Sequence, residues 1–227
     1  MNQAASDTGT DRKFANTLAR GLGILRAYLA HGGRNDKFRL GPAAIALGSV
    51  ASVAVSFVDM ASDAMQELAD ETRTLALIAV RDGDRMMLVR TWRPRTASTI
   101  WLEPGHRIPV YGSSSGLATL ASLDEDRFEA LEPDDRLRDF RREGYEQLLA
   151  QGFVLAPPDT RYARNVNAVS VPYYAGEFGE PVSFSCGALP ADLPDDRILS
   201  QVGPALRDVV SGIEQRTGRA PALSRRG

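Results

Sequence analysis

Residues Leu102 to Leu123 read LEPGHRIPVYGSSSGLATLASL, and this stretch decides how the chain is interpreted. An apolar strand predicted over Ser98–Leu102 leads into it, and a loop of small residues, Gly112–Gly116, opens a helix predicted from Leu117. The first N–H groups of a helix lack partners within the helix and form the positive end of its dipole. Together with the loop's hydroxyls, they make a candidate cradle for a carboxylate or another anion. The three hydroxyls belong to Ser113, Ser114 and Ser115.

Two other interpretations fit the same loop. Serine is a favoured helix cap, so the loop also fits a well-capped helix that binds nothing. Gly112–Gly116 matches the pattern G-x-S-x-G as well, with Ser114 as the nucleophile of a hydrolase. In that fold the histidine base follows the serine, whereas both histidines of this chain, His31 and His106, precede it. The order counts against a hydrolase, which stays an alternative.

Composition excludes several classes of protein. The 227 residues suffice for one good-sized domain with an appendage, and the net charge of -2 gives no global basic field for nucleic acid. Cys186 is the only cysteine, so no internal disulfide can form, and with two separated histidines we expect no metal site and no cofactor. We find no membrane-spanning run and no signal peptide, so a reducing, cytoplasmic location without a membrane partner is expected.

The N-terminal part of the chain is predicted to be helical with one short extended piece. Apolar residues at helical spacing predict a helix over Phe14–Ala30, which His31 and the glycines after it end. Lys37–Leu40 is the extended piece. A long helical segment follows from about Ala43 to Glu71, with a break near Ser56 to Asp59. Its apolar first part fits packing on a partner subunit or on its own domain.

The rest of the chain predicts an antiparallel sheet with inserted helices, which is an α+β fold class. Asp82-Gly83 is a hairpin signal between two apolar runs, and Gly152 ends a helix. The charges of that helix are interpreted as a solvated face, and Thr217–Gly227 is predicted to be a disordered tail. Besides Ser98–Leu102, strands are expected at 75–80, 86–91, 153–155, 167–173 and 181–188, and helices at 117–123, 134–151 and 195–216.

Seven short motifs make the sequence similar to the IclR family of bacterial transcriptional regulators. They are LARGL (18–22), FRLGP (38–42), ELADET (67–72), GHRIPVY (105–111), GFV (152–154), VSVP (169–172) and GEPV (179–182). The resemblance implies a winged helix-turn-helix, a linker helix and a GAF-like effector domain with a six-stranded antiparallel sheet between helices. The corresponding bounds begin with 1–41 for a disordered N-terminal segment and a truncated winged helix-turn-helix. They continue with 42–57 for the linker helix, 58–218 for the effector-binding domain and 219–227 for the tail.

The DNA-binding head departs from the family pattern. A complete member reads the major groove with a recognition helix before the wing. Here five residues, Gly32 to Asp36, separate the first predicted helix from the strand at Lys37. They cannot hold two further helices of roughly 8 residues each. By this count the recognition helix is missing.

The resemblance also implies an effector pocket. Its positions match residues on the serine loop, the adjoining strand and the later strands. They are Ser113, Ser114, Ser115, Ile100, Leu102, Asp159, Ala168 and Cys186. Members often have lysine where this chain has Leu117, and many have histidine where it has Tyr111. The pocket is therefore expected to carry less charge and to bind a small organic or aromatic acid.

Our leading hypothesis is a ligand-sensing transcriptional regulator that works as a homodimer or tetramer. Promoter DNA is its expected partner only if a DNA-binding domain with a recognition helix is present. The alternatives are the serine-loop hydrolase and a sensor that does not bind DNA. Such a sensor would form mixed oligomers with intact regulators through Ala43–Phe57.

Overall fold

The computed structural model describes residues 29–32, 37–44, 46–48 and 56–222. The chain divides into two compact units, Met1–Ser56 and Phe57–Gly227. In the first unit, β1 (Leu29–Gly32) pairs antiparallel with β2 (Lys37–Leu40). Residues 42–44 and 46–48 are helical, as predicted.

The helix predicted over Phe14–Ala30 is wrong at its end. Leu29 and Ala30 lie in β1, where they pair with Leu40 and Arg39. Helical periodicity continues through these residues, but the short distance to β2 along the chain lets the backbone form a strand ladder instead. The remainder of that predicted helix lies outside the described residues.

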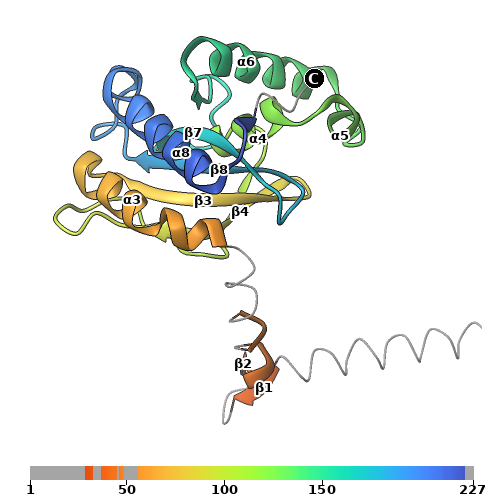
Figure 1. The fold of residues 1–227 in the computed structure, drawn as a ribbon, viewed down its shortest axis with the longest axis vertical. Helices are drawn as coiled ribbons and strands as arrows, with labels where there is room; N and C mark the ends of the chain where they lie inside the picture. Colours follow the sequence, from red (N-terminus) through yellow and green to blue (C-terminus); the bar gives the residue numbers. More distant parts are fainter. Residues whose placement is uncertain (1–28, 33–36, 45, 49–55, 223–227) are drawn as a thin grey trace, which may run out of the picture. The chain divides into compact units, whose positions relative to one another are not determined.

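The second unit is built on a six-stranded antiparallel sheet in the order β5-β4-β3-β8-β7-β6. Strands β3, β4, β7 and β8 of this sheet are labelled in Figure 1. This arrangement confirms the α+β prediction. The hairpin turn at Asp82-Gly83 is confirmed too, since Asp82 pairs with Arg85 and Gly83 has a φ of 64°. The strands are β3 (Leu75–Asp82), β4 (Arg85–Trp92), β5 (Arg107–Pro109), β6 (Val154–Leu155), β7 (Asn167–Ala175) and β8 (Glu180–Ala188).

The strand predicted over Ser98–Leu102 is not formed. The edge strand beside β4 is β5 instead, with Met87 paired to Arg107. Ile100 and Leu102 are partly buried against the core, whereas Trp101 is 70% exposed. The side chains of this segment therefore do alternate in burial. The edge of β4, however, pairs with β5, which lies closer to the serine loop in the chain.

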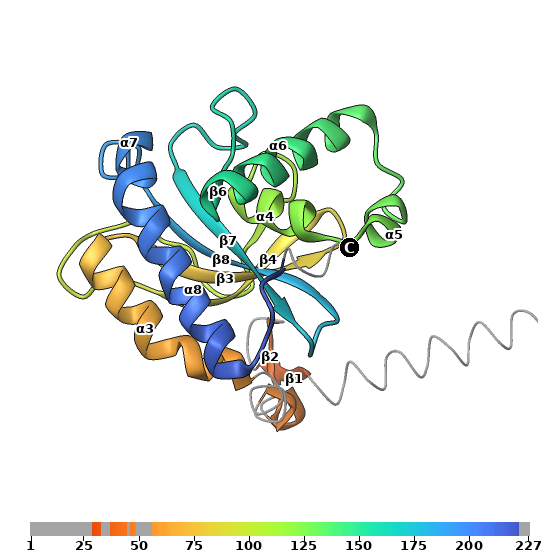
Figure 2. The ribbon, with the colours of Figure 1, turned by 45° about the horizontal axis from the view of Figure 1, so that its top comes forward.

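Helices cover both faces of the sheet (Figure 2). Phe57 of α3 stacks against Tyr173 of β7 with ring centroids 5.1 Å apart, which places α3 on one face, where α8 also packs. Helix α4 packs on β7 and β8 from the other face, with α6 against it. The helices are α3 (Ser56–Thr72), α4 (Ser114–Ser122), α5 (Glu125–Glu129), α6 (Asp135–Gln151), α7 (Asp195–Arg197) and α8 (Gly203–Thr217), with a π-helical turn η1 (Ile198–Val202) before α8.

One charge of α6 is not part of the solvated face that the sequence predicts. Arg141 is buried, and its guanidinium donates to the carbonyls of Leu120 and Leu123 at the end of α4 and to Glu125. A cation at the carbonyl end of a helix is favourable because it meets the negative end of the dipole. Arg141 therefore holds α4 and α6 together.

The segment after α8 is also more ordered than predicted. Thr217 belongs to α8, and Ala222 is only 3% exposed. The N–H of Ala222 donates to the carboxyl group of Glu214. Glu214 lies in a mainly apolar pocket between α8, β7 and the end of α6. Burial raises the pKa of Glu214 to about 7, and the bond from Ala222 offsets part of this rise.

This burial predicts a pH-dependent stability that Glu214→Gln should remove. Because the folded-state pKa lies above the unfolded value of about 4.3, Glu214 costs no stability below pH ~4 and destabilises the fold increasingly as the pH rises through about 7. We expect Glu214→Gln to match the wild type near pH 4.5 and to exceed its unfolding free energy at pH 8, measured by urea denaturation. Glu67→Gln, at an exposed site on α3, serves as the control. Parallel pH profiles for wild type and Glu214→Gln would contradict the prediction.

Candidate functional site

A narrow cavity opens at the N-terminal end of α4, on the sheet face that α4 covers. The space open to the centres of water molecules is about 40 Å³, which is room for roughly three waters. Two loops complete its wall, one before β5 and one between β6 and β7. The lining residues are Leu77, Ile100, Leu102, Ile108, Gly112, Ser113, Ser114, Ser115, Ala156, Arg161, Tyr162, Ala163, Val166, Ala168, Ser185, Cys186 and Gly187.

Ser113 is the helix cap that one interpretation of the sequence predicted. Its Oγ accepts the N–H of Gly116 at 3.0 Å and donates to the carbonyl of Pro109 at 2.6 Å. Helix α4 therefore begins at Ser114, three residues before the predicted start at Leu117. The serine loop is the first turn of the helix, so the N–H groups of Ser114 and Ser115 have no partner within the helix.

The start of α4 is joined to the sheet by a chain of buried hydroxyl groups. The Oγ of Ser170 on β7 donates to that of Ser114 at 2.8 Å and lies 2.7 Å from that of Ser185 on β8. The Oγ of Ser185 also lies 2.9 Å from those of Ser115 and Ser183. Each of these five serines is buried. The chain therefore satisfies polar groups that would be costly to bury alone.

The direction of the hydrogen bonds in this chain follows from the fact that each hydroxyl has one hydrogen. Ser170 donates to Ser114, so Ser185 must donate to Ser170. The hydrogen of Ser185 is then used, and both Ser115 and Ser183 must donate to Ser185. Ser114 accepts at the end of the chain, and within the described part of the molecule no acceptor takes its own hydrogen. Ser114 thus offers a free donor at the cavity.

Two glycines fix the start of α4 against its surroundings. Gly112 has a φ of 80°, and its carbonyl accepts the N–H of Tyr162 at 3.1 Å. A Cβ at Gly116 would lie 2.0 Å from the carbonyl oxygen of Val110. Only glycine permits this close approach of backbone to helix. The glycines therefore hold the serine turn against two loops.

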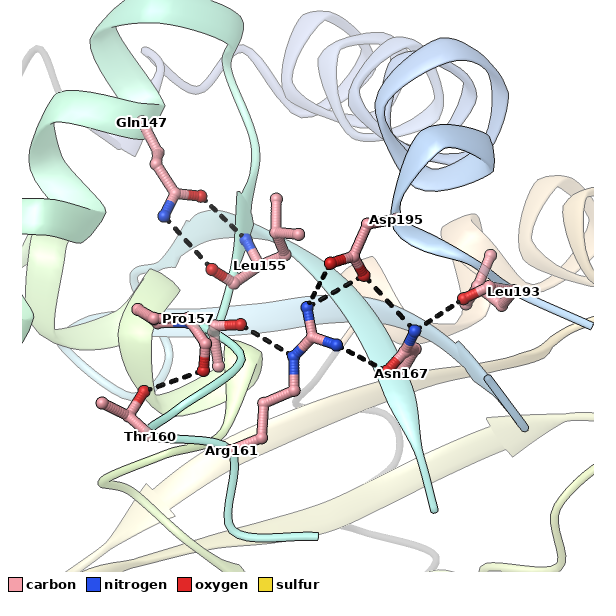
Figure 3. A network of polar contacts seen from close by, with 9 residues as sticks. Gln147, Leu155, Pro157, Thr160, Arg161, Asn167, Leu193 and Asp195 are labelled. Atoms are coloured by element: carbon pink, nitrogen blue, oxygen red, sulfur yellow. Dashed lines mark hydrogen bonds and ion pairs between the residues drawn. The ribbon is translucent and has the colours of Figure 1, made fainter. Parts of the chain in front are cut away.

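Arg161 lines the cavity, and Figure 3 shows the polar contacts of its guanidinium. Its Nε donates to the carbonyl of Ala156 at 2.9 Å, and its Nη1 donates to Oδ1 of Asn167 at 2.7 Å. Its Nη2 donates to both carboxylate oxygens of Asp195, at 2.9 and 2.8 Å. The cation is therefore neutralised by Asp195 and anchored to the loop, to β7 and to α7.

The loop that carries Arg161 is held by Gln147 of α6. The side-chain amide of Gln147 accepts the N–H of Leu155 at 3.0 Å and donates to its carbonyl at 3.2 Å (Figure 3). It satisfies the outer edge of β6 as a neighbouring strand would. At the mouth, partial burial of the Tyr162 ring raises the pKa of its phenol, although 44% of the residue stays exposed. Tyr162 is therefore a neutral donor at neutral pH.

The structure brings most of the predicted site residues together. The three serines, Ile100, Leu102 and Ala168 border the cavity. Asp159 does not line the cavity and is exposed in the turn that precedes Arg161. That turn closes with the N–H of Thr160 bonded to the carbonyl of Pro157, which leaves Asp159 at its tip.

Cys186 borders the cavity through β8, but its thiol faces the other way. It lies between Ser185, which meets Ser115 on the α4 face, and Gly187, which lines the cavity. Successive side chains in a strand point to opposite faces, so the thiol faces the side that α3 covers. Burial raises the pKa of Cys186 to about 12, and a hydrogen bond with Thr74 offsets part of this rise. The thiol is therefore neutral and inert.

The sequence did not identify the serines that the sheet contributes to the hydroxyl chain, and it did not identify Arg161. These serines are Ser170, Ser183 and Ser185. Ser183 and Ser185 alternate with buried apolar residues on β8, which indicates a polar stripe on one face. That pattern could have revealed them. Ser170 lies alone in a buried strand, and Arg161 lies in a loop beside other charges. Neither gives a local signal.

Among the described residues, the geometry does not bring a histidine to Ser114. In the described part of the chain the hydrogen-bond partner of Ser114 is Ser170 and not an imidazole. Among the described residues, no cluster of three or more His, Cys, Asp or Glu side chains could hold a metal ion. No described helix is long and apolar enough to cross a bilayer.

Gly116→Ala should destabilise the domain through a backbone clash. The added Cβ would lie 2.0 Å from the carbonyl oxygen of Val110, so α4 or the preceding strand must shift. We expect a loss of about 2 to 3 kcal/mol in unfolding free energy, measured by chemical denaturation. Gly212→Ala, at a helical glycine with open space around it, should not lower stability. Equal stability of the two variants would contradict the observed packing.

Comparisons with known proteins agree with this architecture. Residues 51–145 match the family model described as bacterial transcriptional regulator IclR C-terminal. No curated protein matches the sequence. The chain is similar in structure to an IclR family transcriptional regulator from Brucella abortus, with a TM-score of 0.70 and 24% identity over 88% of this chain and 78% of that one.

Two further similar structures contain aromatic acids. One is an IclR homolog from Microbacterium hydrocarbonoxydans complexed with 4-hydroxybenzoate, with a TM-score of 0.65 and 21% identity over 93% of this chain and 85% of that one. The other is a double mutant of the PobR inducer-binding domain from Acinetobacter in complex with 3-hydroxybenzoic acid. Its TM-score is 0.55, at 17% identity over 68% of this chain and 95% of that one. At these identities the likeness establishes the fold.

Proposed function

We propose that this chain carries an effector-binding domain of the IclR family of bacterial transcriptional regulators and that it senses a small aromatic carboxylic acid in the cavity at the start of α4. The observation that carries the proposal is the free hydroxyl hydrogen of Ser114. It ends a hydrogen-bond chain that runs from the sheet toward the cavity. Bonds in such a chain polarise one another, so the last donor is strengthened.

The carboxylate would be bound by three donors on one turn of helix. The N–H groups of Ser114 and Ser115 have no intrahelical partner, and the Ser114 hydroxyl lies beside them. The helix dipole favours an anion at this end. Donor and anion together make charge-assisted bonds, which are stronger than neutral ones.

The remaining wall of the cavity suits an aromatic ring. Leu77, Ile100, Leu102 and Ile108 supply apolar surface, and Tyr162 at the mouth supplies a hydroxyl that could meet a polar ring substituent. Two relatives of the same fold bind hydroxybenzoates. The free space of about 40 Å³ is small for such a ring. Binding therefore requires the loop wall to move outward, which is induced fit of the kind that sensors use.

Ser114→Ala tests the placement of the carboxylate. Loss of one charge-assisted donor should weaken binding of 4-hydroxybenzoate about tenfold, measured by calorimetry. Binding of the neutral 4-hydroxybenzamide should fall less. Ser122→Ala is the matched control, since its hydroxyl lies on the same helix, donates to the carbonyl of Ala118 and does not line the cavity.

Two results would count against this proposal. Undiminished affinity of Ser114→Ala for 4-hydroxybenzoate would mean that the carboxylate lies elsewhere. Absence of binding to the wild type and to related benzoates would reject the class of ligand. Hydrolysis of activated esters that disappears in Ser114→Ala would instead restore the enzyme hypothesis.

We further propose that the chain alone does not read DNA in a sequence-specific way. The residue count in the sequence supports this, because five residues, Gly32 to Asp36, separate the first predicted helix from the strand at Lys37. Residues 1–28, which precede β1, lie outside the described part of the chain. A mobility-shift experiment with upstream promoter DNA across a salt series should show only weak binding that salt abolishes. Specific retention of promoter DNA over unrelated DNA at physiological salt would contradict the proposal. Binding only after an intact relative is added would favour the mixed-oligomer alternative.

A further inference from the structure

One ion pair ties the cavity wall to the C-terminal helices. Arg161 lines the cavity and donates from one nitrogen to both carboxylate oxygens of Asp195, the first residue of α7. The Arg161 side chain is mostly buried, and that of Asp195 is partly buried. The side-chain amide of Asn167 also contacts both partners, at 2.7 Å from Arg161 and 3.3 Å from Asp195. A displacement of the loop that carries Arg161 must therefore either move α7 or break this pair.

Helix α7 in turn reaches the end of α3. Two residues after Asp195, the guanidinium of Arg197 donates to the carbonyl of Thr72 at 2.7 Å. Thr72 is the last residue of α3, so the cation meets the negative end of that helix dipole. The same guanidinium donates to the carbonyl of Asp192, which fixes it to the segment before α7. A continuous set of polar contacts thus leads from the cavity to α3.

The π-helical turn η1 separates this route from α8. The N–H of Gly203 bonds to the carbonyl of Ile198, five residues earlier. Gly203 itself packs on the ring of Phe153, where an added Cβ would lie 2.5 Å from a ring carbon. Helix α8 is therefore fixed to the core at its first residue, while α7 lies beyond a locally widened turn. Such turns are frequent at functional sites because they interrupt the helical ladder.

We propose that Arg161 and Asp195 are positioning residues that couple occupation of the cavity to the C-terminal end of α3. This inference rests on the proposed function. A ligand that moves the loop shifts Asp195 and, with it, the contact of Arg197 on Thr72. Helix α3 begins at Ser56, where the first compact unit ends. The ligand acts only to the extent that it binds the two arrangements differently.

The first test uses the full chain without ligand. We measure amide hydrogen exchange in the last turn of α3, Leu68–Thr72. Asp195→Asn should raise exchange there about fivefold, as expected for a lost partly buried ion pair. Arg161→Gln should do the same, and the double variant should not exceed the larger single effect, because either change already breaks the pair.

The matched control is Asp196→Asn. It removes the same charge one residue further along α7, where the side chain is exposed, and should leave α3 unchanged. Exchange in α6, on the opposite face of the sheet, should also be unchanged. A rise at α3 that is equal in Asp195→Asn and Asp196→Asn would overturn the proposal. So would a rise of the same size throughout α6, which would show general loss of stability.

The second test adds 4-hydroxybenzoate to saturation. In the wild type it should change exchange at Leu68–Thr72 at least threefold. Asp195→Asn should bind the acid at least as tightly as the wild type, because Arg161 is then unpaired, but it should show no such change. A full response in Asp195→Asn would overturn the coupling. Failure of the wild type to bind would reject the proposed ligand, while the comparison without ligand would still decide the role of the ion pair.

Discussion

The burial of the N-terminal end of α4 against β7 and β8 is the constraint on which the rest of the domain depends. A helix start carries unpaired N–H groups, and three adjacent serines add hydroxyls that cost about 1 to 3 kcal/mol each if they are buried without a partner. The structure meets this demand with Ser113 as a cap and with Ser170 and Ser185 as partners from the sheet. These bonds hold α4 in one position relative to the two strands. The cavity is the space that remains beside them.

Features determined by nearby residues could be predicted from the sequence. Asp82-Gly83 requires a tight turn between two apolar runs, and Gly152 ends α6 in the left-handed conformation that glycine adopts without strain. The strand pair β7–β8 and the capping role of serine in the loop follow from equally local signals. The α+β class depends only on such elements and their order, and it is therefore the most secure prediction.

Features that depend on distant partners could not be predicted. Ser98–Leu102 has the alternation of a strand, but β5 takes its place beside β4 because pairing is decided by the whole sheet. Leu29 and Ala30 have helical periodicity and still pair with β2. In the candidate site, Arg161 gains its place only through Asp195 and Asn167, which lie outside its own loop. Asp159, two residues earlier, was the more obvious polar candidate, but it is exposed and does not line the cavity.

The electrostatics of the cavity explain why affinity and conformational change should be linked. Leu117 is buried apolar core at the position where the family resemblance expects lysine, and the charge of Arg161 is already paired with Asp195. A carboxylate therefore gains mainly from helix N–H groups and a neutral hydroxyl while that pair is intact. Any arrangement in which the pair loosens leaves Arg161 free to attract an anion, so the proposed acid would bind that arrangement more tightly. By linkage, the ligand must then favour the loosened arrangement by the same factor. A fixed lysine would bind the acid more strongly, but it would give the ligand no reason to prefer one arrangement of α7 over another.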